Sequence, residues 1–308
     1  MGRYTRCLLE ALRATQRGEL VESHRPRRCQ VFHSPWLDGV LLRSPVPQVV
    51  TLHDLAPLTR RGEYLRTGMR FRLRYLAVQR AARVIVPTQA LAERAVETLG
   101  LGREQVVVIP EGPASVFYPR PAQEVAAVRS RHRLPERYLL WVGQLTAPDP
   151  HKRVAALVRA RRRLPLVLVG PAGRWARELP DVTLTGALSD DELAAVYTGA
   201  QALVFASDHE GYGLPPVEAL ACGTPVAAAD VPALREVLQG RAILHPAEDL
   251  EGLIAAAEAA RPPAPPPPSW SWADAAARTW EVYEQAMHVR AAMRAPRQPR
   301  PSAVRALH

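Results

Sequence analysis

Two carboxylates, Glu210 and Glu218, are separated by seven residues in a segment whose pattern predicts a strand, a loop, a helix and a second strand. The apolar run 202–205 predicts a buried strand, Pro215 suits a helix start, and Gly223 suits the helix end. Glu210 falls in the loop and Glu218 in the first helical turn. Backbone N–H groups at a helix start favour phosphate, whereas carboxylates repel phosphate and accept hydrogen bonds from hydroxyl groups. The segment therefore suits a diphosphate flanked by polyols, as in a nucleotide sugar.

The segment 210–226, which reads EGYGLPPVEALACGTPV, resembles the Glu-x7-Glu donor motif of glycosyltransferase family 4. The resemblance extends to residues 191–193, 234–237 and 272–273, and covers the chain from Gly2 to about Tyr283. It implies an α/β chain of the GT-B fold, in which two Rossmann-like domains with parallel sheets face a central cleft. It also implies a retaining, mannosyltransferase-like hexosyltransferase of polysaccharide biosynthesis.

Length and composition agree with two ordinary domains. The chain has 308 residues, of which 47% are hydrophobic, and three cysteines without metal-ligand spacing. No apolar run approaches the ~18 residues of a membrane-spanning helix, and the polar, basic start predicts no signal peptide. We expect a cytoplasmic protein with reduced cysteines.

A net charge of +10 could indicate a partner that is a nucleic acid. The basic residues are spread along the chain, however, and no nucleic-acid-binding motif accompanies them. We therefore expect no nucleic-acid partner. Lys152 is the only lysine among 40 basic residues, which makes it conspicuous.

Strand and helix patterns alternate, as in parallel α/β sheets. Expected strands in the first half are 30–32, 49–52, 84–86 and 106–109, and the proline-containing stretch 110–121 reads as a linker. Further strands are expected at 138–143, 166–170, 182–184, 202–205 and 226–229, and a last helix at 270–287. We predict an acceptor-side domain over 1–121, a nucleotide-sugar domain over 122–269, a helix over 270–290 that packs back on the first domain, and a disordered tail over 291–308.

Lys152 follows a predicted strand and loop, just ahead of a predicted helix. A solvated cation at a helix start is unfavourable against the helix dipole, which favours a functional reading over a merely solvated Lys-Arg pair. The resemblance implies that Lys152 neutralises the donor diphosphate. Where the family has an arginine directly after Gly143, this chain has Gln144, and Arg153 is the candidate to replace it.

His53 follows the predicted strand 49–52, and ligands of open α/β sheets lie at the carboxyl ends of the strands. The resemblance implies that His53 contacts the donor sugar, although a lone histidine is more often a packed or capping residue. His33 follows a different strand and is a poorer candidate, His209 reads as loop surface, and Asp54 reads equally well as a helix cap.

The predicted catalytic residues are thus His53, Lys152 and Glu210. The resemblance assigns the donor to a wider set, namely Gly143, Gln144, Lys152, Arg153, Gly186, Glu210, Gly211, Tyr212, Gly213, Leu214 and Glu218. Gly2, Arg3 and Tyr4 resemble the end of the family's first glycine loop, so the first domain is expected to be reduced and to lack its first strand.

We expect no metal and no cofactor, because no Asp-x-Asp motif or Cys/His cluster appears. The resemblance implies a front-face substitution in which the leaving diphosphate helps to deprotonate a hydroxyl acceptor. Three alternatives remain open, which are a hydrolase-like pair of carboxylates, a non-catalytic remnant that binds nucleotide or sugar, and a sugar-nucleotide epimerase.

Arg66, Arg70 and Arg74 recur every four residues, with Leu65, Met69, Leu73 and Leu76 on another face of the same predicted helix. A core-packed helix with a solvated basic face is one interpretation. Peripheral contact with an anionic membrane is the other.

Overall fold

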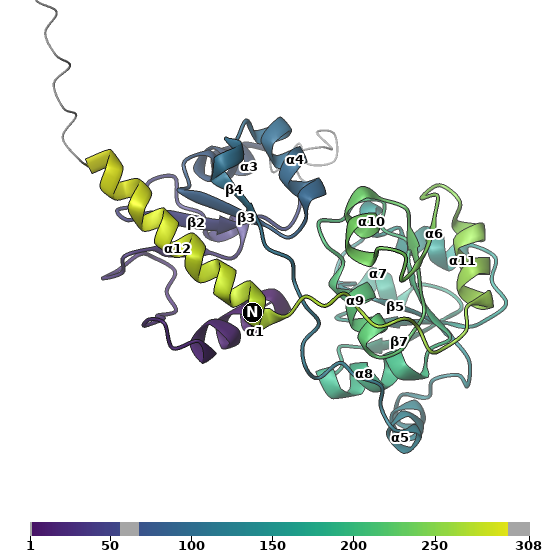
Figure 1. Ribbon diagram of the computed structural model, residues 1–308. Coiled ribbons are helices and arrows are strands. Elements are labelled where there is room, and N and C mark those ends of the chain that lie inside the picture. Colours follow the sequence, from purple (N-terminus) through teal and green to yellow (C-terminus); the bar gives the residue numbers. More distant parts are fainter. Residues whose placement is uncertain (1, 56–67, 295–308) are drawn as a thin grey trace, which may run out of the picture.

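The protein is described by a computed structural model, in which residues 2–55 and 68–294 can be described. Two parallel sheets form separate lobes, one with the strand order β1-β2-β3-β4 and one with the order β10-β9-β8-β5-β6-β7 (Figure 1). Helices cover both faces of each sheet, which is the α/β architecture expected from the alternating pattern. We call the two parts the N-terminal lobe and the C-terminal lobe.

The two central strands of the N-terminal lobe, β2 and β3, are rich in valine and largely buried on both faces, as parallel strands are. The elements of this lobe are α1 (Arg3–Ala14), β1 (Phe32–Ser34), the 3₁₀ turn η1 (Leu37–Gly39), β2 (Gln48–Thr51), α3 (Gly68–Gln79), β3 (Arg83–Val86), α4 (Gln89–Leu99), η2 (Arg103–Gln105) and β4 (Val106–Val108). Alternate residues face opposite cores, so Val50 and Val84 pack toward α3 and α4. Val49 and Ile85 pack on the other side, toward α1 and the last helix of the chain.

The C-terminal lobe begins with α5 (Ala122–His132), after a connection without regular structure over the expected linker 110–121. Its remaining elements are β5 (Leu139–Val142), η3 (Pro150–Lys152), α6 (Val154–Arg159), β6 (Leu166–Val169), α7 (Arg174–Arg177), β7 (Val182–Gly186), α8 (Asp190–Gly199), β8 (Ala202–Phe205), α9 (Leu214–Ala221), β9 (Val226–Ala229), α10 (Pro232–Leu238), β10 (Ile243–His245) and α11 (Leu250–Ala259). The chain builds outward from β5 to β7 and then returns to the other side of β5 with β8.

The last helix, α12 (Trp272–Arg294), returns to the N-terminal lobe after the proline-rich stretch 262–268. Figure 1 shows it lying along the N-terminal sheet, and it packs against α1 and β2. Tyr283 donates or accepts a 2.7 Å hydrogen bond with His33 Nδ1, and Trp280 Nε1 donates to Thr15 Oγ1 over 2.7 Å. The chain therefore connects the two lobes twice.

Several sequence predictions need correction. Strand β1 lies two residues later than expected, β10 was not predicted, and Glu218 lies in the second turn of α9, because the helix begins at Leu214. On α3, Leu73 and Leu76 were expected on the packed face, yet they are 50% and 47% exposed. The helix packs instead through Tyr75 and Val78, because its hydrophobic pattern offered two competing faces.

Other predictions concern residues that lie partly or wholly outside the described ranges 2–55 and 68–294. The basic stripe includes Arg66, outside the described residues, while Arg74 forms an ion pair with Asp38. The predicted disordered tail over 291–308 lies outside them from residue 295 on, and its first four residues belong to helix α12, so the prediction was wrong for those four. The missing first strand stays a prediction.

Replacing Tyr283 by phenylalanine should destabilise the docked helix α12. The substitution removes the hydroxyl that meets His33 Nδ1, and burial already lowers the pKa of His33 to about 3, so its ring is neutral and depends on hydrogen bonds. Leaving a buried ring nitrogen without a partner costs about 1–3 kcal/mol. Urea unfolding would measure this loss, with Tyr118→Phe as control because Tyr118 is 49% exposed. Equal free energies of unfolding for Tyr283→Phe and the wild type would contradict the assignment.

Candidate active site between the two lobes

A pocket of about 290 Å³ lies between the lobes, at the carboxyl ends of strands from both sheets. It is lined by His53, Asp54 and Glu111 from the N-terminal lobe, and by Asp149, His151, Lys152 and the run from His209 to Leu214 from the C-terminal lobe. All three predicted catalytic residues, His53, Lys152 and Glu210, are among them. As expected from the sequence, each of them follows a parallel strand, and the pocket lies at that edge of the sheets.

Lys152 and Glu210 meet because β5 and β8 are neighbours although they are far apart in the chain. The loop after β5 carries Lys152, and the loop after β8 carries Glu210. Two hydrogen bonds join these loops, since Asp208 N donates to the His151 carbonyl over 3.0 Å and His151 Nδ1 lies 3.1 Å from Asp208 Oδ1. The order of strands reverses between β5 and β8, which is where doubly wound sheets bind their ligands.

Glu210 keeps some exposure toward the pocket, while protein atoms crowd its carboxyl group. Burial raises its pKa to about 7, against the opposing influence of Lys152. A carboxyl group with this pKa can accept a hydrogen bond from a hydroxyl group or, when protonated, donate one. The Lys152 ammonium lies 3.9 Å from Asp149 Oδ2 and supplies a positive charge beside Glu210.

His53 is held on three sides in the N-terminal lobe. Its Nε2 lies 3.1 Å from the Pro35 carbonyl oxygen, and its Nδ1 lies 3.5 Å from Glu111 Oε1. The rings of Tyr4 and Trp36 lie 4.4 Å and 5.0 Å from the His53 ring, centroid to centroid. These contacts fix the ring at the pocket wall.

Glu111 is the most informative residue that the sequence argument missed. It is 2% exposed, follows β4, and places its carboxylate beside His53. The same signal that identified His53, a polar residue just after a parallel strand, could have found it. His209 was expected at the loop surface, yet it lines the pocket and lies 3.0 Å, through Nε2, from Arg94 Nη1, so that expectation was wrong.

Not every predicted donor residue lines this pocket. Gly143, Gln144, Arg153, Gly186 and Glu218 lie elsewhere, whereas Gly211, Tyr212, Gly213 and Leu214 form its wall. Arg153 takes a left-handed conformation, with φ of 52°, between η3 and α6. Gly213 has φ of 95° at the start of α9, a conformation that favours glycine.

Glu218 is 2% exposed and is engaged across the lobe boundary. The Arg3 guanidinium, from the first turn of α1, forms an ion pair with Glu218 Oε1 and a second one with Asp190 Oδ1 at 2.6 Å. Tyr197 donates a 3.1 Å hydrogen bond to Glu218 Oε2. Arg3 and Tyr4 are thus helical residues and not part of a loop, and we call the Arg3 contacts with Glu218 and Asp190 the Arg3 clasp.

Further contacts hold the lobes together beside the pocket. The Glu236 carboxylate, on α10, accepts hydrogen bonds from the backbone N–H groups of Gln89 and Ala90, at 2.7 Å and 2.9 Å. These donors start α4, so a residue of the C-terminal lobe caps a helix of the N-terminal lobe. A Cβ atom at Gly211 would overlap the His53 carbonyl oxygen, which explains a glycine there. The pocket is therefore closed on this side by direct contact.

Comparisons with known proteins agree with this geometry. Residues 136–260 match the family model described as "Glycosyl transferases group 1", and residues 4–113 match "Glycosyltransferase Family 4". The D-inositol 3-phosphate glycosyltransferase of Kineococcus radiotolerans is 30% identical over 88% of this chain and 75% of its own length. The serotype-specific mannosyltransferase WbdA of Escherichia coli is 28% identical over 63% of this chain, which spans only 26% of that protein.

Solved structures show the same fold. A sucrose-phosphate synthase from Thermosynechococcus elongatus superposes with a TM-score of 0.66 over 84% of this chain and 74% of its own, at 23% identity. Anabaena HepE in complex with UDP-glucose superposes with a TM-score of 0.60 over 93% of this chain and 82% of its own, at 15% identity. The chain has the GT-B fold.

The chain belongs to glycosyltransferase family 4. Across residues 2–55 and 68–294, no helix is long and apolar enough to cross a membrane. In the same described residues, no three His, Cys, Asp or Glu side chains gather as a metal site would require.

The stability of the protein should depend on pH through Glu210. Its pKa rises from 4.5 to about 7 on folding, so the folded state holds the proton more tightly than the unfolded state. The free energy of unfolding should therefore fall as pH rises from about 4.5 through 7, and this contribution should be absent in Glu210→Gln. Thermal unfolding from pH 4.5 to 8 would show the two curves diverging, the variant being the more stable at pH 8. Glu97→Gln, an exposed control, should stay parallel to the wild type; a constant offset between Glu210→Gln and wild type would count against the shift.

Breaking the Arg3 clasp should destabilise the protein. Arg3→Ala leaves the buried Glu218 carboxylate without its cation, and burial already raises the pKa of Glu218 while Arg3 opposes that rise. We expect a loss of about 1–3 kcal/mol. Arg6→Ala is the matched control, since Arg6 pairs with Asp190 at 2.5 Å but has no contact with Glu218. In a double-mutant cycle with Glu218→Gln, the double variant should lose less stability than the sum of the two single variants, and additivity would disprove the clasp.

Proposed function

We propose that the protein transfers a hexose-type sugar from a nucleoside diphosphate sugar to a hydroxyl acceptor, with retention at the anomeric carbon and without a metal. The observation that carries the proposal is that His53, Lys152 and Glu210, from two sheets, line one pocket. The names of relatives support transfer of sugars, and HepE was crystallised with UDP-glucose.

Lys152 would meet the diphosphate. A leaving diphosphate gains negative charge as its bond to the sugar breaks, and a fixed cation in a pocket poor in water stabilises that charge. Lys152 is 30% exposed through its side chain, so it can reach a ligand without unfolding of the loop. Amide groups at the start of α9, next to Gly213 and Leu214, would add further donors.

Glu210 and His53 would hold the transferred sugar from opposite lobes. The Glu210 carboxyl group would accept a hydrogen bond from a sugar hydroxyl. His53 would contact the sugar from the other lobe, with its ring nitrogen Nδ1 beside Glu111. In the step itself the bond from the anomeric carbon to the diphosphate oxygen breaks, and the bond to the acceptor oxygen forms on the same face. The acceptor proton passes to the leaving phosphate oxygen, so no residue of the chain has to act as the nucleophile.

The nucleoside would extend beyond the pocket toward Glu218. A volume of about 290 Å³ lies at the lower limit of small-molecule sites, which are roughly 300–1,000 Å³, and suits a sugar diphosphate better than a whole nucleotide sugar. Glu218 would accept hydrogen bonds from the ribose hydroxyls once its ion pair with Arg3 is broken. Donor binding would then open the Arg3 clasp, a step of the kind that often gates two-lobed enzymes.

Peripheral membrane contact is a second proposal, which rests on α3. Leu73 and Leu76 are 50% and 47% exposed there, an apolar pair that an interfacial surface could cover. Co-sedimentation with anionic liposomes would test it, with Leu73→Ser and Leu76→Ser expected to reduce the bound fraction. Equal recovery with and without liposomes would exclude it.

A donor panel tests the proposed reaction. UDP, GDP, TDP and ADP sugars would be incubated with candidate acceptors, and the release of nucleoside diphosphate followed. A non-catalytic remnant would bind a nucleotide without releasing sugar, and an epimerase would convert the donor without an acceptor. Failure of every nucleotide to raise the thermal unfolding temperature would contradict the proposal, because a ligand at 100 times its Kd adds about 2.7 kcal/mol of stability.

Lys152→Ala should weaken nucleoside diphosphate binding by roughly ten- to a hundredfold and leave nucleoside monophosphate binding unchanged. The estimate follows from losing a charged hydrogen-bond partner of only the distal phosphate, worth about 1.5–3 kcal/mol. Calorimetry with UDP and UMP, or with GDP and GMP, would measure both constants. Arg159→Ala is the control, since Arg159 is exposed on α6 and outside the pocket. A Lys152→Ala protein with wild-type affinity for the diphosphate would remove Lys152 from the site.

A further inference from the structure

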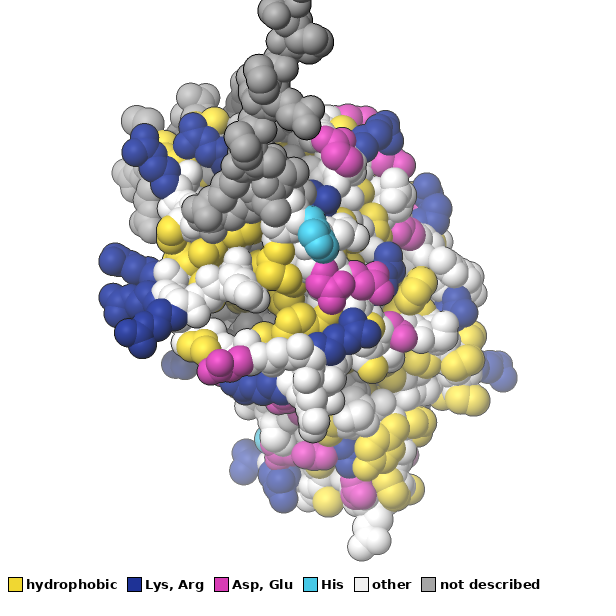
Figure 2. Space-filling model, turned by 60° about the vertical axis from the view of Figure 1, so that its left-hand side comes forward, with side chains coloured by type: hydrophobic (Ala, Val, Ile, Leu, Met, Phe, Trp, Pro, Cys, Tyr) yellow, Lys and Arg dark blue, Asp and Glu magenta, His cyan; other side chains and the backbone are white. Residues whose placement is uncertain are grey.

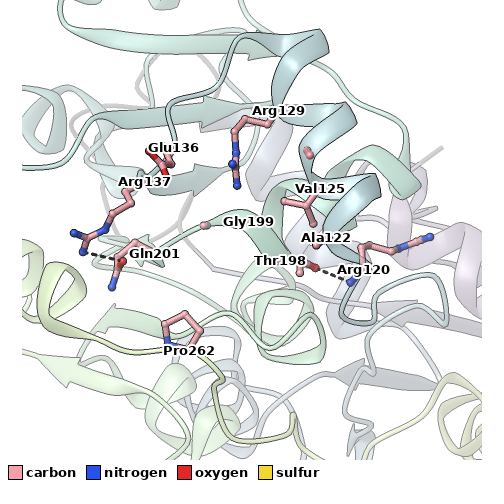
Figure 3. A pocket seen from close by; sticks show the side chains of 12 residues that line it. Arg120, Ala122, Val125, Arg129, Glu136, Arg137, Thr198, Gly199, Gln201 and Pro262 are labelled. Carbon is pink, nitrogen blue, oxygen red and sulfur yellow. Dashed lines mark hydrogen bonds between the residues drawn. The ribbon is translucent and has the colours of Figure 1, made fainter.

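A second and larger pocket lies on the opposite edge of the C-terminal sheet. It has a volume of about 600 Å³ and is bordered by α5, the end of α8, the residues just before β5 and β8, and Pro262 (Figure 3). Lys152 and Glu210 follow β5 and β8, whereas Arg137 and Gln201 precede the same two strands. The two pockets share no lining residue and are separated by the length of these strands, so this one is not a subsite of the sugar pocket.

Three arginines line this second pocket, and they differ in whether an acidic side chain neutralises their charge. The Arg120 guanidinium is neutralised by Asp191, at 2.7 Å, and by Glu124, at 3.4 Å. Arg137 is exposed and, among the residues that the structure describes, donates only to an uncharged group, the Gln201 amide oxygen, over 3.2 Å. Gln201 is itself fixed, since its Nε2 donates to the Ala260 carbonyl.

Arg129 has no such partner. Its Nε is buried without a hydrogen bond, and within the described chain no ion pair engages its guanidinium. Figure 3 shows the side chain extending from α5 into the pocket toward Gly199, while Arg137 reaches Gln201 from another direction. Glu136 is the single acidic residue that lines the pocket, and it forms no ion pair with Arg129 or Arg137 among the described residues.

An arginine with an unsatisfied, buried N–H group is costly unless a ligand completes its hydrogen bonds. The Arg129 guanidinium in the pocket, with Arg137 adding positive charge at the rim, suits a dianionic phosphate, which has acceptor oxygens on all sides, better than a singly charged carboxylate. Val125, Ala122, Ala126 and Pro262 supply an apolar wall beside them. The volume falls in the range of about 300–1,000 Å³ typical of small-molecule sites.

We propose that this pocket binds a phosphate monoester that carries an organic group, with Arg129 on the phosphate, Arg137 adding positive charge at the rim, and the apolar wall against the remainder. The site is independent of the sugar pocket and of the reaction proposed for it. On the face that Figure 2 shows, basic side chains lie at several separate places, so positive charge alone does not select this pocket.

Calorimetry on the full-length chain, with glucose 6-phosphate, inorganic phosphate, acetate and glucose as probes, tests the proposal. Glucose 6-phosphate should bind most tightly, inorganic phosphate more weakly, and acetate and glucose not measurably. Arg129→Gln should weaken glucose 6-phosphate binding by about tenfold or more, and Arg137→Gln by a few-fold. Arg129→Gln should not lower the unliganded unfolding temperature and should raise it slightly, because the substitution removes a buried N–H group that has no hydrogen-bond partner.

Two controls separate this site from the sugar pocket and from the net charge. Lys152→Ala should leave glucose 6-phosphate binding intact, and so should Arg177→Gln, an exposed arginine on α7. Binding that Lys152→Ala abolishes would place the ligand in the sugar pocket and overturn the proposal. An equal loss of affinity in Arg177→Gln, or wild-type affinity in Arg129→Gln, would also overturn it. Tighter binding of acetate than of phosphate would overturn it as well. So would the absence of heat from glucose 6-phosphate at about 10 mM, a concentration at which even millimolar affinity is saturating.

Discussion

The parallel pairing of β5 with β8 is the constraint on which the site depends. Because β6 and β7 are added on one side of β5 and β8 on the other, the loops that follow β5 and β8 diverge at the sheet edge and leave room between them. The His151–Asp208 contacts then tie these loops at a fixed distance. The strand order determines where residues 152 and 210 lie, and the local sequence determines that a lysine and a glutamate stand at these two positions.

Sequence reasoning succeeded where a local rule and the topology agree. His53, Lys152 and Glu210 each follow an apolar strand, so the edge at which they meet could be predicted from the chain alone. The alternating pattern likewise predicted both sheets, since buried parallel strands are short apolar runs between helices. Family resemblance added the two-lobed arrangement, which periodicity does not contain.

The failures share a physical cause, which is contact between distant segments. Nothing near Glu218 in the sequence indicates an ion pair with Arg3, which lies more than two hundred residues earlier. His209 looked like loop surface because Arg94, which approaches it, belongs to the other lobe. On α3, the choice of packed face was set by the sheet beneath, and the helix pattern alone favoured Leu73 and Leu76 wrongly.

The double connection between the lobes has a mechanical consequence. The linker 110–121 crosses once, and the stretch before α12 crosses back, so the lobes are joined by two roughly adjacent segments (Figure 1). Two covalent connections restrict the directions in which the lobes can move relative to each other more than a single connection would, because any movement must keep both segments intact. A protease cut in either segment would leave the lobes attached but remove that restriction on direction. The directions in which the lobes can separate therefore depend on the segment that leads back to α12 as well as on the residues that line the pocket.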